Sequence, residues 1–205
     1  MTEDEARQWI VERFGREREA KLAAFVALLI KESEHQNLVS KASLSEIWAR
    51  HIVDSAQLLT IANLPTDGLW IDIGTGAGLP GIVIATLRDA PMLMVEPRRK
   101  RVEFLDICTE VLGLGHAVTS LSKIESVESG AAAIVSARAV SLLSKLFQSG
   151  HHVSTPDTLW LLPKGKSAQL EVVEARKAWQ GSFHVEQSIT HPDSKIIVAR
   201  GVCAR

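Results

Sequence analysis

The first apolar pattern along the chain has helical spacing. Between positions 17 and 35, apolar residues recur at intervals of three and four, namely at Leu22, Phe25, Val26, Leu29 and Ile30. Lys21, Lys31, Glu32 and Glu34 fall at the other positions. One face of such a helix is apolar and the other is charged. The spacing therefore predicts an amphipathic helix from Glu17 to His35.

A second helical pattern begins after Ser43. Glu46 stands three residues after Ser43, which is the spacing of a capping box at a helix N-terminus. The side chains expected to be buried are Leu44, Ile47, Trp48, Ile52 and Leu59. We therefore expect residues 1–63 to form a helical N-terminal extension.

The pattern changes after the turn-forming segment from Leu64 to Gly68. Short apolar runs now alternate with longer helical stretches, which is typical of a mainly parallel sheet. The expected strands are Leu69–Ile73, Met92–Val95, Ala117–Thr119, Ala132–Val135 and Leu159–Leu162, and the expected helices lie near Gly81–Leu87, Arg99–Leu112, Leu142–His151 and Ala168–Trp179. Residues 64–205 are thus predicted to form an α/β three-layer sandwich.

The C-terminal region predicts a β-hairpin. Two apolar stretches, Phe183–Ile189 and Lys195–Ala199, flank the turn-forming residues His191 to Ser194. Such a hairpin would add an antiparallel strand at the edge of the sheet. No linker separates independent domains, so 205 residues are expected to form a single domain.

Composition narrows the class of protein. The chain is 46% hydrophobic and 23% charged, which is ordinary for a globular protein. Cys108 and Cys203 are isolated, so neither a disulfide framework nor a zinc site is expected, and the histidines show no metal-ligand spacing. An acidic start and the lack of a long apolar run predict a cytoplasmic protein that does not enter a membrane.

A glycine-rich turn carries the main chemical signal. Gly74, Gly76 and Gly78 follow a predicted strand and precede a predicted helix, as in loops that bind nucleotides. Glycine permits positive φ and close approach of a ligand to the backbone. Glu96 ends the next apolar run, where an acidic side chain can bind the hydroxyl groups of a ribose. A tight connection without a ligand is the alternative for the turn alone.

Two other nucleotide sites fit less well. A dinucleotide-binding G-x-G-x-x-G motif would require glycine three residues after Gly76, where Leu79 stands. The chain also lacks the G-x-x-x-x-G-K-[ST] sequence of a P-loop. A nicotinamide dehydrogenase and a P-loop hydrolase are therefore disfavoured.

Several segments, taken together, resemble one family. They are Asn37-Leu38, Arg50-His51-Ile52-Val53-Asp54-Ser55, the glycine loop with Leu79-Pro80-Gly81, Glu96 with Arg98-Arg99-Lys100-Arg101 and Phe104-Leu105, Ser136-Ala137-Arg138-Ala139, and Lys164-Gly165. In this order they are similar to the bacterial 16S rRNA guanine-N7 methyltransferases, also called glucose-inhibited division protein B. The segments before and after the loop make this resemblance more specific than the loop itself.

The resemblance implies a Rossmann-like methyltransferase fold that uses S-adenosylmethionine. The cofactor-binding residues expected from the loop and from the resemblance are Gly74, Gly76, Gly78, Leu79, Glu96, Ile124, Glu125 and Arg138. The implied reaction is methyl transfer to N7 of a specific guanine in 16S rRNA, and the implied partner is that RNA or the small ribosomal subunit. A monomer is the default expectation, and neither a metal nor a membrane is implied.

No general base is expected for this reaction. Guanine N7 carries an in-plane lone pair and has no proton to lose, so catalysis would come from orientation of the reactants. A donor should reach O6 alone because N7 must stay free. Arg138, Arg50 and Lys164 are candidates for positioning the base.

Clustered basic residues are the expected contacts to RNA. With a formal net charge of -1, the chain offers a polyanion no overall attraction, so local clusters must bind it. The substrate-binding candidates are Arg50, His51, Arg98, Arg99, Lys100, Arg101, Lys164 and Lys166. For Arg50 and His51, and for the basic run, a solvated helix surface is the alternative interpretation. A non-catalytic RNA-binding module and a methyltransferase for another nucleic acid or a small molecule also remain open.

Overall fold

The computed structural model describes residues 1–62 and 67–205, leaving aside the side chains at positions 41 and 42. Within these ranges, a seven-stranded sheet has the order β3-β2-β1-β4-β5-β7-β6. The strands are β1 Trp70–Ile73, β2 Met92–Val95, β3 Ala117–Ser120, β4 Ile134–Ala137, β5 Leu159–Lys164, β6 Trp179–Gln187 and β7 Lys195–Ala204. The first five are parallel, and β7 pairs antiparallel with β5 and β6. The mainly parallel sheet and the C-terminal hairpin are confirmed.

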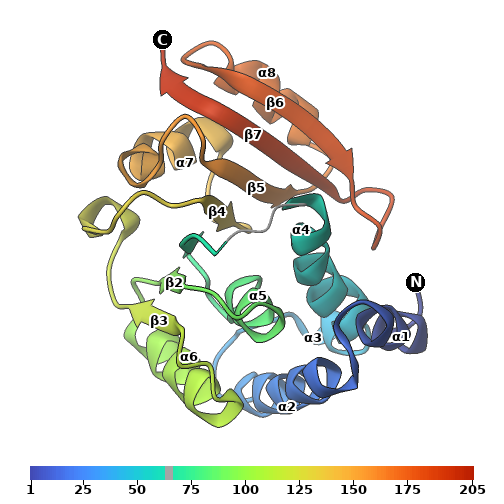
Figure 1. The fold of residues 1–205 in the computed structure, drawn as a ribbon. Helices are drawn as coiled ribbons and strands as arrows, with labels where there is room; N and C mark the ends of the chain where they lie inside the picture. The colour runs from blue at the N-terminus through green and yellow to red at the C-terminus, as the bar shows by residue number, and fades with distance from the viewer. Residues whose placement is uncertain (63–66) are drawn as a thin grey trace.

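Helices cover both faces of the sheet (Figure 1). The helical elements are α1 Glu3–Phe14, α2 Arg16–Glu32, α3 Lys41–Leu44, η1 Trp48–Val53, α4 Asp54–Ala62, α5 Gly81–Leu87, α6 Arg99–Leu112, η2 Ile124–Ser126, α7 Leu143–Gly150, η3 His151–Val153 and α8 Ala168–Ala175. One buried cluster joins α1, α2 and α4–α6 to one face of the sheet, and another joins α7 and α8 to the opposite face.

Alternation along the buried strands produces these layers. In β1, Trp70 belongs to the cluster beneath the N-terminal helices, whereas Ile71 and Ile73 belong to the cluster beneath α7 and α8. Successive side chains of a strand point to opposite faces, and helices on both faces leave all four residues of β1 buried. This is the three-layer sandwich that the apolar runs predict.

The N-terminal extension is helical, but its predicted boundaries need correction. The helix predicted from Glu17 to His35 is α2, which ends at Glu32, and Ile30 is exposed rather than buried. The predicted capping box at Ser43 is wrong: Ser43 lies inside α3, and its hydroxyl donates to the Ser40 carbonyl at 2.8 Å. Glu46 instead forms an ion pair with Arg50. Ser43 and Glu46 thus have the spacing of a capping box, but their side chains bind Ser40 and Arg50.

Residues 48–53 form a π-helix, η1, which leads directly into α4. Its first turn is capped from a distance, because the Glu3 carboxylate accepts hydrogen bonds from the backbone N–H groups of Trp48 at 3.0 Å and Ala49 at 2.9 Å. Glu3 opens α1, whose own N-terminus carries a capping box formed by Thr2 and Glu5. The first helix of the chain thus fixes the start of the π-helix.

Two other findings complete the comparison with the predicted elements. Trp179, expected at the end of a helix, begins β6, since α8 ends at Ala175. Residues 64–66 of the predicted turn-forming segment lie outside the described residues. Among the described helices, none is both long and apolar enough to cross a membrane.

Candidate active site

The glycine loop joins β1 to α5 at the carboxyl end of the parallel strands. Gly74, Gly76 and Gly78 have φ values of +65°, +60° and +81°. A Cβ at Gly76 would lie 2.9 Å from Nη1 of Arg101, and a Cβ at Gly78 would lie 2.5 Å from Cγ1 of Ile82. The positive φ favours glycine at all three positions, as the sequence pattern predicts, and at Gly78 the space beside Ile82 is also too small for a Cβ.

The buried carboxylate of Asp72 holds the end of the glycine loop. Asp72 accepts a hydrogen bond from the backbone N–H of Gly81 at 3.0 Å and another from the Ser136 hydroxyl at 2.7 Å. Trp70 in turn donates to Ser136 through its indole N–H. Burial raises the pKa of Asp72 to about 6 despite these hydrogen bonds. Sequence reasoning did not single out Asp72, although an acidic residue within an apolar strand was a usable signal.

Glu96 lies at the end of β2, against the glycine loop. Its fully buried carboxylate accepts from the Gly76 backbone N–H at 3.0 Å and from both the backbone and the side chain of Arg98. Burial alone would raise the pKa of Glu96, but the hydrogen bonds from Arg98 outweigh it and hold the pKa below its usual value. Glu96 is therefore an oriented carboxylate beside the loop.

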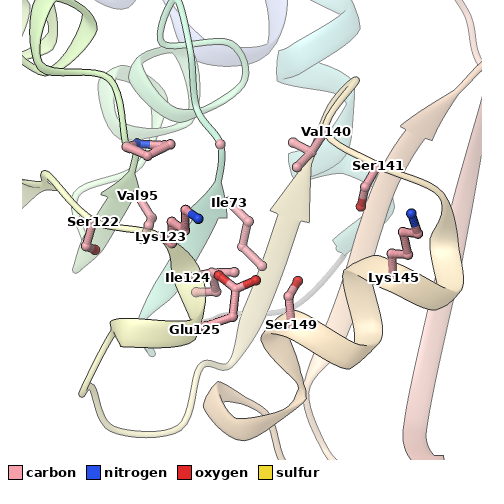
Figure 2. A pocket seen from close by; sticks show the side chains of 12 residues that line it. Ile73, Val95, Ser122, Lys123, Ile124, Glu125, Val140, Ser141, Lys145 and Ser149 are labelled. Carbon is pink, nitrogen blue, oxygen red and sulfur yellow. The ribbon is translucent and has the colours of Figure 1, made fainter.

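A cavity of 340 Å³ opens beside these residues, between the ends of β1 and β2, η2 and α7 (Figure 2). Gly74, Ile124 and Glu125, three of the predicted cofactor-binding residues, line it. Its remaining lining residues were not predicted: Ile73, Val95, Pro97, Ser122, Lys123, Val140, Ser141, Lys145 and Ser149. Most of these lie at or after strand ends or on α7. The fold brings these separate segments together, so the sequence pattern alone did not indicate them.

Gly76, Gly78, Leu79, Glu96 and Arg138 do not line this cavity. The first four belong to the loop or contact it, and Leu79 is buried in the core beneath the N-terminal helices. Arg138 follows β4 and contacts His51 and Asp54 instead.

Arg138 meets two residues of the N-terminal extension. One Nη of its guanidinium lies 3.3 Å from Nδ1 of His51, and the other lies 3.5 Å from Oδ2 of Asp54. Burial, followed by the positive charges of Arg138 and Arg50, lowers the pKa of His51 to about 4. The imidazole is therefore neutral at pH 7, and its Nδ1 can accept a hydrogen bond from Arg138.

The basic run from Arg98 to Arg101 is divided by the structure. The Arg98 guanidinium binds Glu96 at 2.7 Å, and Arg101 lies against the glycine loop and donates to the Asn37 carbonyl at 3.3 Å. Arg99 and Lys100 are exposed in the first turn of α6. The run therefore combines two residues that contact the loop region with two that face solvent.

The other predicted substrate-binding residues also differ in their surroundings. Lys164 is nearly buried, and its ammonium group donates to the Ser141 carbonyl at 2.7 Å and to Glu171 at 2.8 Å. Lys166 is exposed and pairs with Asp193, and Arg50 is exposed and pairs with Glu46. Within residues 1–62 and 67–205, no group of three or more His, Cys, Asp and Glu side chains has an arrangement that could hold a metal ion.

Comparison with known proteins agrees with this geometry. A family model described as rRNA small subunit methyltransferase G matches residues 18–200. A relative from Novosphingobium aromaticivorans, named ribosomal RNA small subunit methyltransferase G, is 47% identical over 98% of this chain and 89% of its own length. A relative of the same name from Erythrobacter litoralis is 45% identical over 98% of this chain and 97% of its own.

Solved structures of low sequence identity share the fold. A SAM-dependent methyltransferase from Aquifex aeolicus has a TM-score of 0.62 at 13% identity and covers 82% of this chain and 96% of its own. A glycopeptide N-methyltransferase complexed with S-adenosylmethionine has a TM-score of 0.60 at 11% identity, covering 74% and 94%. The sequence matches extend over both the N-terminal helices and the sheet, and the chain belongs to the rRNA small subunit methyltransferase G family.

Proposed function

We propose that this chain transfers a methyl group from S-adenosylmethionine to N7 of one guanine in 16S rRNA. The observation that carries the proposal is the convergence of the glycine loop, Glu96 and the 340 Å³ cavity at the carboxyl ends of the parallel strands. Ligands of open α/β sheets bind in this crevice. Family membership supports small-subunit rRNA as the substrate, and the cavity supports binding of the cofactor.

The residues around the cavity fit S-adenosylmethionine. Ile73, Val95 and Ile124 supply apolar walls for a purine, and Glu96 stands at the strand end that suits a ribose. Gly74 keeps the backbone free of a Cβ, which would lie 2.7 Å from Val140. We assign cofactor binding to Gly74, Gly76, Gly78, Leu79, Glu96, Ile124, Glu125 and Arg138, with Gly76, Gly78 and Leu79 acting through loop shape.

The reaction needs orientation more than proton transfer. When bound, S-adenosylmethionine supplies a methyl group on a positively charged sulfur, which guanine N7 can accept without losing a proton. The chain's part is then to hold the base and exclude wrong poses, an effect that can reach roughly 7 to 11 kcal/mol. A neutral His51 fits this scheme, because its Nδ1 can accept from Arg138 and so hold that guanidinium in place.

RNA contacts are assigned to the exposed basic residues. Arg99, Lys100, Arg50 and Lys166 are exposed. Arg98 and Arg101 lie between this surface and the glycine loop, whereas His51 and Lys164 contribute by positioning their neighbours. We further propose that the chain acts as a cytoplasmic monomer, with residues 1–63 and 64–205 folding as one domain.

The test is incorporation of labelled methyl from S-adenosylmethionine into small-subunit rRNA from cells that lack this protein, followed by nucleoside analysis. We expect one new 7-methylguanosine. Label in a different nucleoside would overturn the assignment of N7. Cofactor binding with no labelled RNA would indicate another substrate, and absence of cofactor binding would support a non-catalytic RNA-binding module.

A further inference from the structure

Lys123 and Lys145 line the 340 Å³ cavity from opposite sides (Figure 2). Lys123 follows β3 and precedes η2, and Lys145 lies in the first turn of α7. Both are exposed, and among the residues that the structure describes neither forms an ion pair with a carboxylate. Arg98, Arg138 and Lys164, by contrast, each pair with one. Two unpaired positive charges therefore stand at this cavity.

The cofactor is a poor partner for these lysines. S-adenosylmethionine carries a sulfonium and an ammonium group against one carboxylate, so it is a cation overall and is repelled by positive side chains on the cavity wall. Glu125, the one carboxylate among the described residues that line the cavity, can offset only one of the two charges. Lys145 also opposes the dipole of α7, because it lies near the N-terminus of that helix. A polyanion such as RNA accounts for both lysines.

Exposed apolar side chains accompany the two lysines. Leu121, two residues before Lys123, is 42% exposed, and Leu142, three residues before Lys145, is 62% exposed. Each of these leucines directly precedes or follows a residue that lines the cavity, and Val140, which lines it, is 44% exposed. Apolar side chains beside unpaired cations match a nucleotide, which combines an apolar base face with an anionic phosphate.

The position of Val140 relates these side chains to the reaction. Val140 belongs to the loop after β4, and a Cβ at Gly74 would lie 2.7 Å from its Cγ2 atom. Because Val140 lines the cofactor cavity, a base that packs against it lies on the cofactor's side of this loop. Apolar contact reaches a base through its ring face, which leaves the edges of the ring, N7 included, open to the methyl group.

We propose that the target nucleotide binds to the rim of the cofactor cavity, which is formed by Leu121, Lys123, Val140, Leu142 and Lys145. The apolar side chains of the rim contact the face of the guanine, and the two lysines bind the phosphates on either side of it. The base then stands next to the cofactor, with N7 free. This assignment rests on the proposed guanine methylation and names the residues that hold its substrate.

The experiment measures kcat/KM for methyl transfer to small-subunit rRNA, taken from cells that lack this protein, at several salt concentrations. Lys123→Gln and Lys145→Gln should each make the slope of log kcat/KM against log salt concentration shallower by about 0.7, the effect of one phosphate contact, and the double variant by about 1.4. Partial unfolding lowers the amount of active enzyme but leaves this slope unchanged. Lys177→Gln, in the exposed turn after α8, removes the same formal charge and should keep the parental slope.

Leu142→Asn tests the base contact separately from charge. Leu142 is the N-cap residue of α7, a position that favours asparagine, so the substitution should not weaken the helix. It should lower kcat/KM about 3-fold to 10-fold and keep the parental slope, because it removes apolar contact and no charge. Val173→Asn, at an exposed apolar position of α8, is the matched control and should keep the parental kcat/KM.

Calorimetric titration with S-adenosylmethionine, without RNA, identifies the partner of the lysines. In both lysine variants the Kd should stay at the parental value or fall, because each variant removes a positive charge from the cavity of a cationic ligand. A rise in the Kd would assign the lysines to the cofactor and overturn the proposal. Parental slopes in both lysine variants, or a parental kcat/KM in Leu142→Asn, would also overturn it. If the parent chain itself labels no guanine, the proposed function is wrong, and this is seen before any variant is compared.

Discussion

At the scale of single residues, Glu96 connects the glycine loop to the basic run. Its two oxygens accept hydrogen bonds from Gly76 and Arg98, which are donors only. In Glu96→Gln, the amide NH2 must face one of these donors and leave it unpaired. We expect the Kd for S-adenosylmethionine to rise by about 10-fold to 100-fold, equivalent to about 1 to 3 kcal/mol. Calorimetric titration measures this change.

A matched control for this titration is Glu110→Gln, an exposed carboxylate on α6. It should bind the cofactor like the parent chain. An unchanged Kd in Glu96→Gln would remove Glu96 from the cofactor site and leave it as a support for Arg98 alone.

His51 makes stability depend on pH. Its folded pKa of about 4 lies below the ordinary histidine value of 6.5, so the unfolded chain binds the proton more readily between these values. This contribution to stability is present above pH 6.5 and is lost as the pH falls toward 4. Lowering the pH from 7.5 to 5 should therefore reduce the free energy of unfolding by about 2 kcal/mol through the protonation of His51. Asp72, with its raised pKa of about 6, changes in the opposite direction over part of this range.

The measurement is urea unfolding of the parent chain and of His51→Gln at both pH values. Asp72 is common to both proteins, so the difference between their pH dependences isolates His51. The variant should lose about 2 kcal/mol less than the parent on acidification. His184→Gln, at an exposed position, controls for removal of an imidazole. Equal losses in the parent and His51→Gln would show that His51 protonates freely in the folded state.

At the scale of elements, periodicity located most of the sheet and its covering helices. β2, α5 and α6 have the predicted bounds, because each is a compact apolar or amphipathic run with clear ends. The π-helix could not be predicted in the same way. Its residues have helical spacing, but the wider turn is stabilised by Glu3, a residue 45 positions earlier in the chain than Trp48. Sequence patterns report local preference, and this cap is a tertiary contact.

Glu3→Gln tests that cap. The carboxylate accepts from two backbone N–H groups at the start of η1, whereas an amide can offer one oxygen. We expect the free energy of unfolding to fall by about 1 to 2 kcal/mol. Urea unfolding measures it, with Asp4→Asn, an exposed neighbour in the same turn, as control. A loss of the same size in Asp4→Asn would assign the effect to the dipole of α1 instead.

The candidate site shows the same division between local and tertiary information. The sequence indicated Gly74, Gly76 and Gly78, since glycine has a local conformational reason to be there. It could not show that Lys164 is neutralised by Glu171 or that Asp54 meets the turn of the C-terminal hairpin. Lys164 and Glu171 meet across the short connection from β5 to α8, whereas Asp54 reaches the hairpin turn because β7 pairs with β5 and α4 packs beside β5. The partners of charged residues in a motif are therefore known only from the fold.

At the scale of the whole molecule, charge pairing decides which basic residues of a nearly neutral chain can meet RNA phosphate. Lys164, Arg98 and Arg138 each pair with a carboxylate. Arg99 and Lys100 are exposed at the start of α6, where basic side chains oppose the helix dipole. Among the residues that the structure describes, no carboxylate forms an ion pair with Arg99 or Lys100. Their charge at this helix start has an electrostatic cost, which binding of RNA phosphate would relieve. These two residues should therefore contribute disproportionately to the salt dependence of RNA binding.

Each phosphate contact to single-stranded RNA contributes about -0.7 to the slope of log K against log salt concentration. Arg99→Gln and Lys100→Gln should each make the slope for small-subunit rRNA shallower by about 0.7, and the double variant by about 1.4. Arg16→Gln, at an exposed position of α2, removes the same formal charge and should keep the parental slope. If all three substitutions change the slope equally, only net charge matters and RNA is not held at α6. A selective change would place the phosphate backbone beside the glycine loop, next to the 340 Å³ cavity proposed for the cofactor.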